Sequence, residues 1–88
     1  MIYTAEKKEI GKVTHFFSKI KVIGFETKET LKIGDEIRII GKGGAVDFIQ
    51  TVESMQKDRI PIQEAKPGEV IGIQVSEEAP QGCCVFKI

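Results

Sequence analysis

The chain has 88 residues, 41% of them hydrophobic and 30% charged, a composition typical of one soluble globular domain with a single core. Thirteen basic and thirteen acidic residues give a net charge of zero, so no global field draws the protein to nucleic acid. No apolar run is long enough to span a bilayer as a helix, and residues 1–9 lack the layout of a signal peptide, so we expect a cytoplasmic protein without membrane contact.

The first half of the chain contains short β-branched segments separated by turn signals. No stretch of ten residues has the spacing of an amphipathic helix. We expect strands over residues 9–17 and 20–26, followed by a tight Gly-Asp corner at residues 31–35. This half of the chain therefore predicts β-structure.

Residues 36–40 alternate between apolar and polar side chains. In a strand this pattern places Ile37 and Ile39 on one face and Arg38 on the other. The glycine-rich residues 41–44 are expected to connect this strand to the next one as a hairpin, because glycine adopts the positive φ angles that such turns require.

The second half begins with a long segment, residues 45–56, whose apolar pattern slips. Gln50 interrupts the buried phase and Met55 lies out of step, which predicts a bulge or a bend. Pro61 confines the short strand of residues 60–62 to an edge of a sheet or to a bulge. Further turns and strands are expected at residues 65–68, 69–75, 80–82 and 83–88.

These elements predict an all-β fold, and specifically a small closed antiparallel β-barrel of six or seven strands. We expect residues 9–88 to form this single domain and residues 1–8 to be an N-terminal extension.

Several segments resemble the second domain of translational GTPases such as elongation factor Tu and initiation factor 2. Residues 10–14 are similar to its opening strand, residues 31–37 to its "lkxGdxv" corner, residues 52–56 to its "VxSMq" strand and residues 65–73 to its "AxxGdxvgixl" turn and strand. The same barrel resembles the C-terminal module of U32 peptidase-like proteins. The resemblance covers residues 9–88 and implies a stand-alone, translation-factor-like barrel.

The GTPase itself is missing from this sequence. No Gly-x-x-x-x-Gly-Lys-Ser/Thr motif is present, and the glycines of residues 41–44 join two strands instead of opening a helix. We therefore expect no nucleotide site and no cofactor.

Catalytic side chains are scarce. His15 is the only histidine, and the only cysteines, Cys83 and Cys84, are neighbours that point to opposite faces of a strand and predict no disulfide. Three such residues fall short of the usual four-ligand zinc set. We expect a protein that is not an enzyme, and a Cys–His hydrolase-like activity stays open as an alternative.

A basic and aromatic segment in the first half suggests contact with RNA. Its candidate residues combine rings for base stacking with cations for phosphates: His15, Phe16, Lys19, Lys21 and Lys42. The resemblance implies tRNA or ribosomal RNA as the partner, because this domain contacts RNA in intact elongation factors. The alternative is that these rings belong to the core and the cations to an ordinary solvated rim.

The main hypothesis is therefore a non-catalytic binding module for RNA or the translation apparatus. The alternative hypothesis is a protein-interaction adaptor that docks in trans to a G domain or to a separate U32-type enzyme. We expect a monomer or a weak homodimer, since Pro61 guards one strand edge against pairing.

Overall fold

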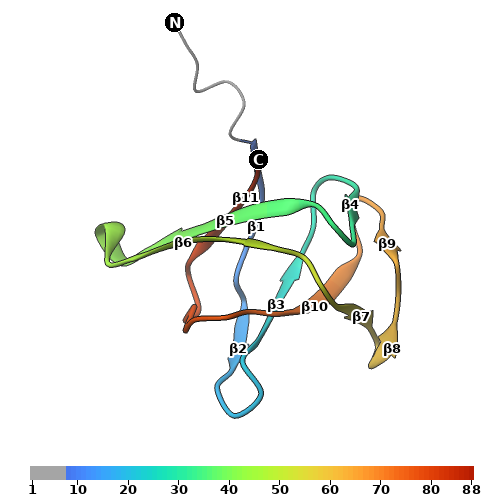
Figure 1. Cartoon of the computed structure of the whole chain (residues 1–88), viewed down its shortest axis with the longest axis horizontal. Coiled ribbons are helices and arrows are strands. Elements are labelled where there is room, and N and C mark those ends of the chain that lie inside the picture. Colours follow the sequence, from blue (N-terminus) through green and yellow to red (C-terminus); the bar gives the residue numbers. More distant parts are fainter. Residues whose placement is uncertain (1–7) are drawn as a thin grey trace, which may run out of the picture.

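The computed structural model describes the backbone of residues 8–88 and all of their side chains except those of Lys8 and Lys42. Their β-branched and alternating segments form short antiparallel strands in three sheets (Figure 1). Within the described residues, no helix is long and apolar enough to cross a membrane.

The first sheet has four strands in the order β1-β11-β5-β6. Their bounds are β1 Lys8–Lys12, β5 Glu36–Gly41, β6 Val46–Thr51 and β11 Cys84–Lys87. The alternation along β5 is as expected: Ile37 and Ile39 are fully buried, and Arg38 points outward to pair with Asp47 at 2.7 Å.

The second sheet has five strands in the order β2-β3-β10-β7-β8. Their bounds are β2 His15–Phe17, β3 Val22–Glu26, β7 Met55–Lys57, β8 Ile60–Pro61 and β10 Val70–Gln74. Pro61 lies in the edge strand β8, as its missing N–H group requires.

A small third sheet pairs β4 (Leu31–Lys32) with β9 (Glu64–Ala65). The connection between β5 and β6 is a short 3-10 turn, η2 (Lys42–Gly44), in which Gly43 and Gly44 have φ values of 64° and 98°. The expected glycine hairpin is therefore present, although it contains one turn of 3-10 helix that the sequence reading did not anticipate.

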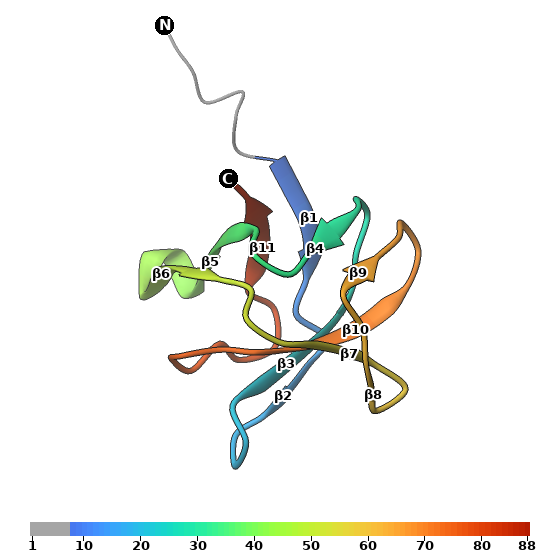
Figure 2. The same ribbon diagram turned by 45° about the vertical axis from the view of Figure 1, so that its right-hand side comes forward.

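Two bends carry the chain from one large sheet to the other (Figure 2). At the first bend, the Val13 N–H donates to the Cys83 carbonyl at 2.8 Å, and the next N–H, of Thr14, donates to the Gly24 carbonyl at 2.9 Å. At the second, Val52 separates β6 from β7 and exchanges hydrogen bonds with the corner at Gly34 and Asp35.

The core lies between the sheets, and apolar side chains from all three contribute to it. Its most deeply buried large residues are Ile10, Ile23, Phe25, Leu31, Ile37, Ile39 and Ile73. Gln50 faces the same side as the buried residues of β6, and its amide donates to the Gln74 carbonyl at 2.9 Å. The interruption in the apolar pattern thus marks a polar link between the two large sheets.

The all-β prediction is confirmed, but the closed barrel of six or seven strands is wrong. Within residues 8–88, β1 and β6 are edges of one sheet and β2 and β8 are edges of the other, and no ladder closes them into a ring. The reason is that both long segments, residues 9–17 and 45–56, bend and give a separate strand to each sheet. The corner strands β4, β8 and β9 have only two residues each.

Candidate functional site

The register of the five-stranded sheet aligns one residue from each strand in a row on its outer face. That row consists of His15, Gly24, Gly72, Gln56 and Pro61. The neighbouring residues of β3 and β10 are buried in the core, so the row faces away from it. The two central members of the row are glycines; the position above Gly24 is open, whereas the side chains of Val22 and Gln56 lie 3.3 Å and 3.5 Å from where a Cβ of Gly72 would be.

A groove of about 670 Å³ follows this row. One wall is formed by His15 and Phe17 of β2, and the other by Gln56 and the turn after β7. A second hollow of about 230 Å³ adjoins it and shares the lining residues Ile20, Val22, Gln56 and Gly72. The two hollows cross the outer face of the sheet, and we call them together the sheet groove.

The rings of His15 and Phe17 stand side by side on this face. Their centroids are 6.1 Å apart and their planes differ by 12°. They are two residues apart in one strand, so their side chains share a face. Phe17 is 52% exposed, whereas Phe16 lies on the opposite face and packs against the core. The exposed ring pair is therefore His15 with Phe17.

Two turns at the rim of the sheet groove contain residues other than glycine with positive φ angles. Lys21, in the turn between β2 and β3, has a φ of 52°. Asp58 and Arg59 form the two-residue turn between β7 and β8 and have φ values of 53° and 65°. Positive φ angles at both central residues are the usual geometry of a two-residue hairpin turn, whereas Lys21 adopts a left-handed conformation that residues with side chains rarely show.

The cations around this face differ in their partners. Lys57 pairs with Glu69 at 2.7 Å; the hydrogen bond to Glu69 raises the pKa of Lys57 and lowers the pKa of Glu69. Lys19, Lys21 and Arg59 form no ion pair with any other residue that the structure describes. Arg59, which lines the sheet groove, and Lys19 and Lys21, in the β2–β3 turn beside it, are thus available to an acidic ligand.

The structure brings together some of the residues predicted from the sequence as an RNA site. His15 lines the sheet groove, and Lys19 and Lys21 lie in the turn at its rim. Phe16 faces the core, and Lys42 lies in η2 at the far tip of the β5–β6 hairpin, its side chain outside the described part of the structure (Figure 1).

Sequence reasoning missed other residues of the sheet groove. Phe17 could have been chosen over Phe16, because a strand beginning at His15 places Phe17 on the histidine's face. Gly24, Gly72 and Arg59 carried no comparable signal, since their proximity depends on the register of four strands.

The cysteines lie away from this groove. Cys83 is buried, and Cys84 is half-buried in β11 of the four-stranded sheet, whereas His15 belongs to the five-stranded sheet. Burial raises the pKa of the Cys84 thiol, and its hydrogen bond with Glu9 raises it further, which keeps the thiol protonated at neutral pH. In the described part of the chain, no three His, Cys, Asp or Glu side chains lie close enough to hold a metal ion.

Comparison with known proteins places the fold. Over 83 residues, 93% of this chain, the sequence is 40% identical to an uncharacterized protease of Methanocaldococcus jannaschii. The chain spans only 20% of that protease's length. No family model matches the sequence.

Two crystal structures of the C-terminal domain of a candidate U32 peptidase from Geobacillus thermoleovorans share the fold. One covers 100% of this chain and 99% of that domain with a TM-score of 0.82 at 16% identity. The chain has the fold of a U32 peptidase C-terminal domain. The selenomethionine form of that domain gives a TM-score of 0.81 at 15% identity, covering 89% of this chain and 96% of the domain. The expected resemblance to the U32 module is confirmed at the level of the fold.

Proposed function

We propose that this chain is an accessory binding domain of U32-type peptidase-like proteins, which contacts the enzyme and does not itself catalyse a reaction. The observation that carries this proposal is the 40% identity along 83 residues with one segment of the Methanocaldococcus jannaschii protease. The C-terminal position of the domain with the same fold in the Geobacillus thermoleovorans protein supports it. This proposal develops the alternative hypothesis drawn from the sequence, a protein-interaction adaptor for a U32-type enzyme.

The chemistry of the sheet groove also supports binding over catalysis. Its walls combine aromatic and aliphatic side chains with the Gln56 amide and the Arg59 guanidinium. Cys84, whose raised pKa disfavours the thiolate, belongs to the other large sheet. A site without an activated nucleophile suits recognition of a partner.

The test is complex formation in trans. The Methanocaldococcus jannaschii protease is prepared without its matching 83-residue segment and mixed with this chain. Size-exclusion chromatography with light scattering is expected to detect a one-to-one complex. A chimera that carries this chain in place of the deleted segment shows whether the truncated protease is still folded. The proposal would be contradicted if the chimera is folded, no complex forms in trans, and the NMR spectrum of this chain is the same within the chimera as in isolation.

The second candidate function is contact with RNA, in keeping with the resemblance to the second domain of translational GTPases. The observation that favours it is the exposed His15–Phe17 ring pair close to Lys19 and Lys21. Stacking on rings beside unpaired cations is a common way to bind single-stranded RNA.

Affinity for tRNA tests this second candidate. We expect affinity to fall steeply as salt concentration rises, and the double substitution Lys19→Ala, Lys21→Ala to reduce it further. Lys28→Ala, an exposed lysine outside the groove, is the matched control. The absence of RNA binding at low salt would exclude this function.

A further inference from the structure

We propose that the sheet groove is a docking site for an acidic, apolar peptide segment of the U32-type enzyme. This inference rests on the accessory-domain function proposed above. It names the surface that makes the contact and the chemistry of the segment that occupies it.

Exposed apolar side chains gather around the sheet groove. Phe17, Ile20 and Val70 line it and are 52%, 57% and 62% exposed. A contiguous group of exposed apolar residues marks an interaction surface, whereas a single exposed residue does not. Burying this group against a partner would remove it from water.

Packing within the fold does not require a glycine at position 24, in the floor of the sheet groove. A Cβ atom built on Gly24 would lie 3.7 Å from the His15 Cβ and 3.9 Å from the Ile71 carbonyl oxygen, which are ordinary contacts. The contrast is Gly11, where a Cβ would lie 2.4 Å from a ring carbon of Phe25. The fold therefore requires glycine at position 11 but tolerates a side chain at position 24. Glycine at position 24 leaves space above the sheet that a ligand side chain could fill.

The charges favour a peptide over RNA. Lys19, Lys21 and Arg59 at the rim attract carboxylates or phosphates alike. However, Asp58 lines the same groove, and its carboxylate repels a phosphate chain. A peptide carries N–H groups that can donate to Asp58 as well as side-chain carboxylates for the cations. Its apolar side chains also match Ile20, Val22 and Val70, aliphatic lining residues that offer no stacking surface to a base.

The experiment measures binding of this chain to overlapping 15-residue peptides tiled over the rest of the Methanocaldococcus jannaschii protease. The peptides that bind are expected to combine acidic residues with a bulky apolar residue. Gly24→Leu, which places a side chain over the floor, should weaken their binding at least about tenfold. Ile49→Ser is the matched control, because Ile49 is 56% exposed on the four-stranded sheet, and it should leave binding unchanged.

Folding of each variant is checked by thermal melting, and Gly24→Ala is the fallback should Gly24→Leu fail to fold, with a smaller loss of binding expected. The preference for acidic peptides is tested with Arg59→Glu, which should weaken the binding of acidic peptides and leave the binding of uncharged peptides unchanged. Peptides that bind Gly24→Leu as well as the wild type would overturn the proposal. The same follows if no peptide binds and oligoadenylate RNA binds in the groove instead.

These outcomes are separable from those of the proposed function. A complex in trans that forms equally well with the wild type and Gly24→Leu would refute the sheet groove and leave the accessory function standing. Peptide binding that depends on Gly24, without a complex in trans, would refute docking to the enzyme body and leave the groove as a peptide site. If the chain forms no complex in trans and binds no peptide, both the accessory function and the sheet-groove proposal are overturned.

Discussion

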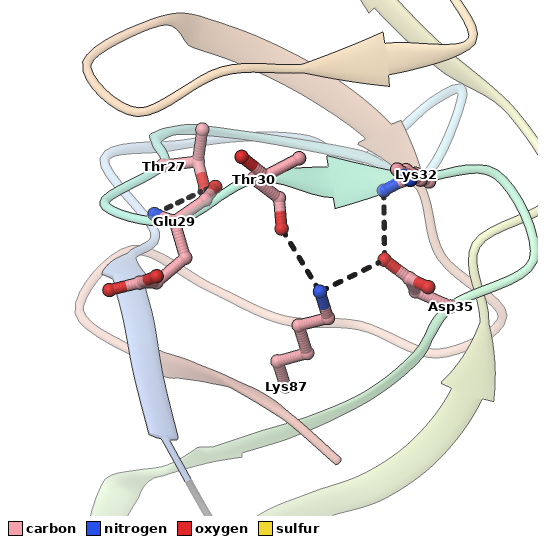
Figure 3. A network of polar contacts seen from close by, with 6 residues as sticks. All are labelled: Thr27, Glu29, Thr30, Lys32, Asp35 and Lys87. Carbon is pink, nitrogen blue, oxygen red and sulfur yellow. Dashed lines mark hydrogen bonds and ion pairs between the residues drawn. The ribbon is translucent and has the colours of Figure 1, made fainter.

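The corner around Asp35 and the sheet groove use their polar groups in opposite ways. At the corner, one carboxylate oxygen of Asp35 accepts a hydrogen bond from the Lys32 N–H at 2.9 Å and pairs with the Lys87 ammonium at 3.4 Å (Figure 3). The same ammonium donates to the Thr30 carbonyl at 3.1 Å. Each group therefore binds another part of the chain, and the last strand is fastened to the β4 corner.

A buried hydroxyl lies in the loop that leads to that corner. Thr27 is fully buried, and its hydroxyl donates to the Glu29 carbonyl at 2.6 Å. The same hydroxyl accepts a hydrogen bond from the Glu29 N–H at 3.4 Å (Figure 3). At the sheet groove, by contrast, Phe17 is exposed and Arg59 pairs with no carboxylate that the structure describes. The comparison teaches that a motif resembling a known family, such as residues 31–37, can serve the fold, while the surface available to a partner lies elsewhere.

The largest expected effect separates a glycine that the fold needs from one that it tolerates. Gly11→Ala should lower the free energy of unfolding by about 2–3 kcal/mol, because the new Cβ overlaps the Phe25 ring and approaches the Glu26 carbonyl. Gly24→Ala should change it by less than about 1 kcal/mol, since its Cβ meets ordinary contacts only. Urea denaturation measures both values, and equal losses would contradict the contrast drawn between these positions.

A smaller effect is expected at the polar corner. Asp35→Ala removes the acceptor for the Lys32 N–H and the partner of Lys87, so it should cost about 1–2 kcal/mol of stability. Lys87→Met removes the ion pair with Asp35 and the hydrogen bond to the Thr30 carbonyl but keeps the hydrogen bond from the Lys32 N–H to Asp35, so it should cost less than about 1 kcal/mol. Neither substitution should alter peptide binding. A loss of binding in Asp35→Ala with unchanged stability would assign the corner to function instead of folding.

The smallest effect is a pH dependence of stability that comes from the Lys57–Glu69 pair. The hydrogen bonds from Lys57 and from the Lys66 N–H lower the pKa of Glu69, so folding favours its ionised form. The stabilisation is present above the unfolded pKa and is lost as the pH falls through the folded pKa. Thermal melts should show a larger loss of stability on acidification in the wild type than in Glu69→Gln. Glu53→Gln, at an exposed site, should behave like the wild type. Identical acid profiles for the wild type and Glu69→Gln would show that this pair contributes nothing.

The sequence was sufficient for features that depend on neighbours in the chain. The alternation of β5 and β10 and the Pro67-Gly68 turn, with Gly68 at a φ of 92°, follow from local rules. The register was not accessible in this way, because it depends on which strands pair. The bends at Val13 and Val52 directed each long segment into two sheets, and the expected barrel closure failed for that reason.

The candidate site was predicted in part for the same reason. His15, Lys19 and Lys21 are close in sequence and remain close in the structure, whereas the floor at Gly24 and Gly72 exists only after β3 and β10 pair. A local pattern can therefore suggest a rim, but the hollow itself is a property of the assembled sheet.

The central claim is that the outer face of the five-stranded sheet contacts the enzyme. The most direct test is NMR amide chemical-shift mapping of the labelled chain, free and mixed with the protease that lacks its matching segment. We predict the largest shifts at Phe17, Gly24, Arg59 and Gly72, with Asp35 unchanged. Large shifts at the Asp35 corner or across the four-stranded sheet, with the sheet groove unchanged, would contradict the account.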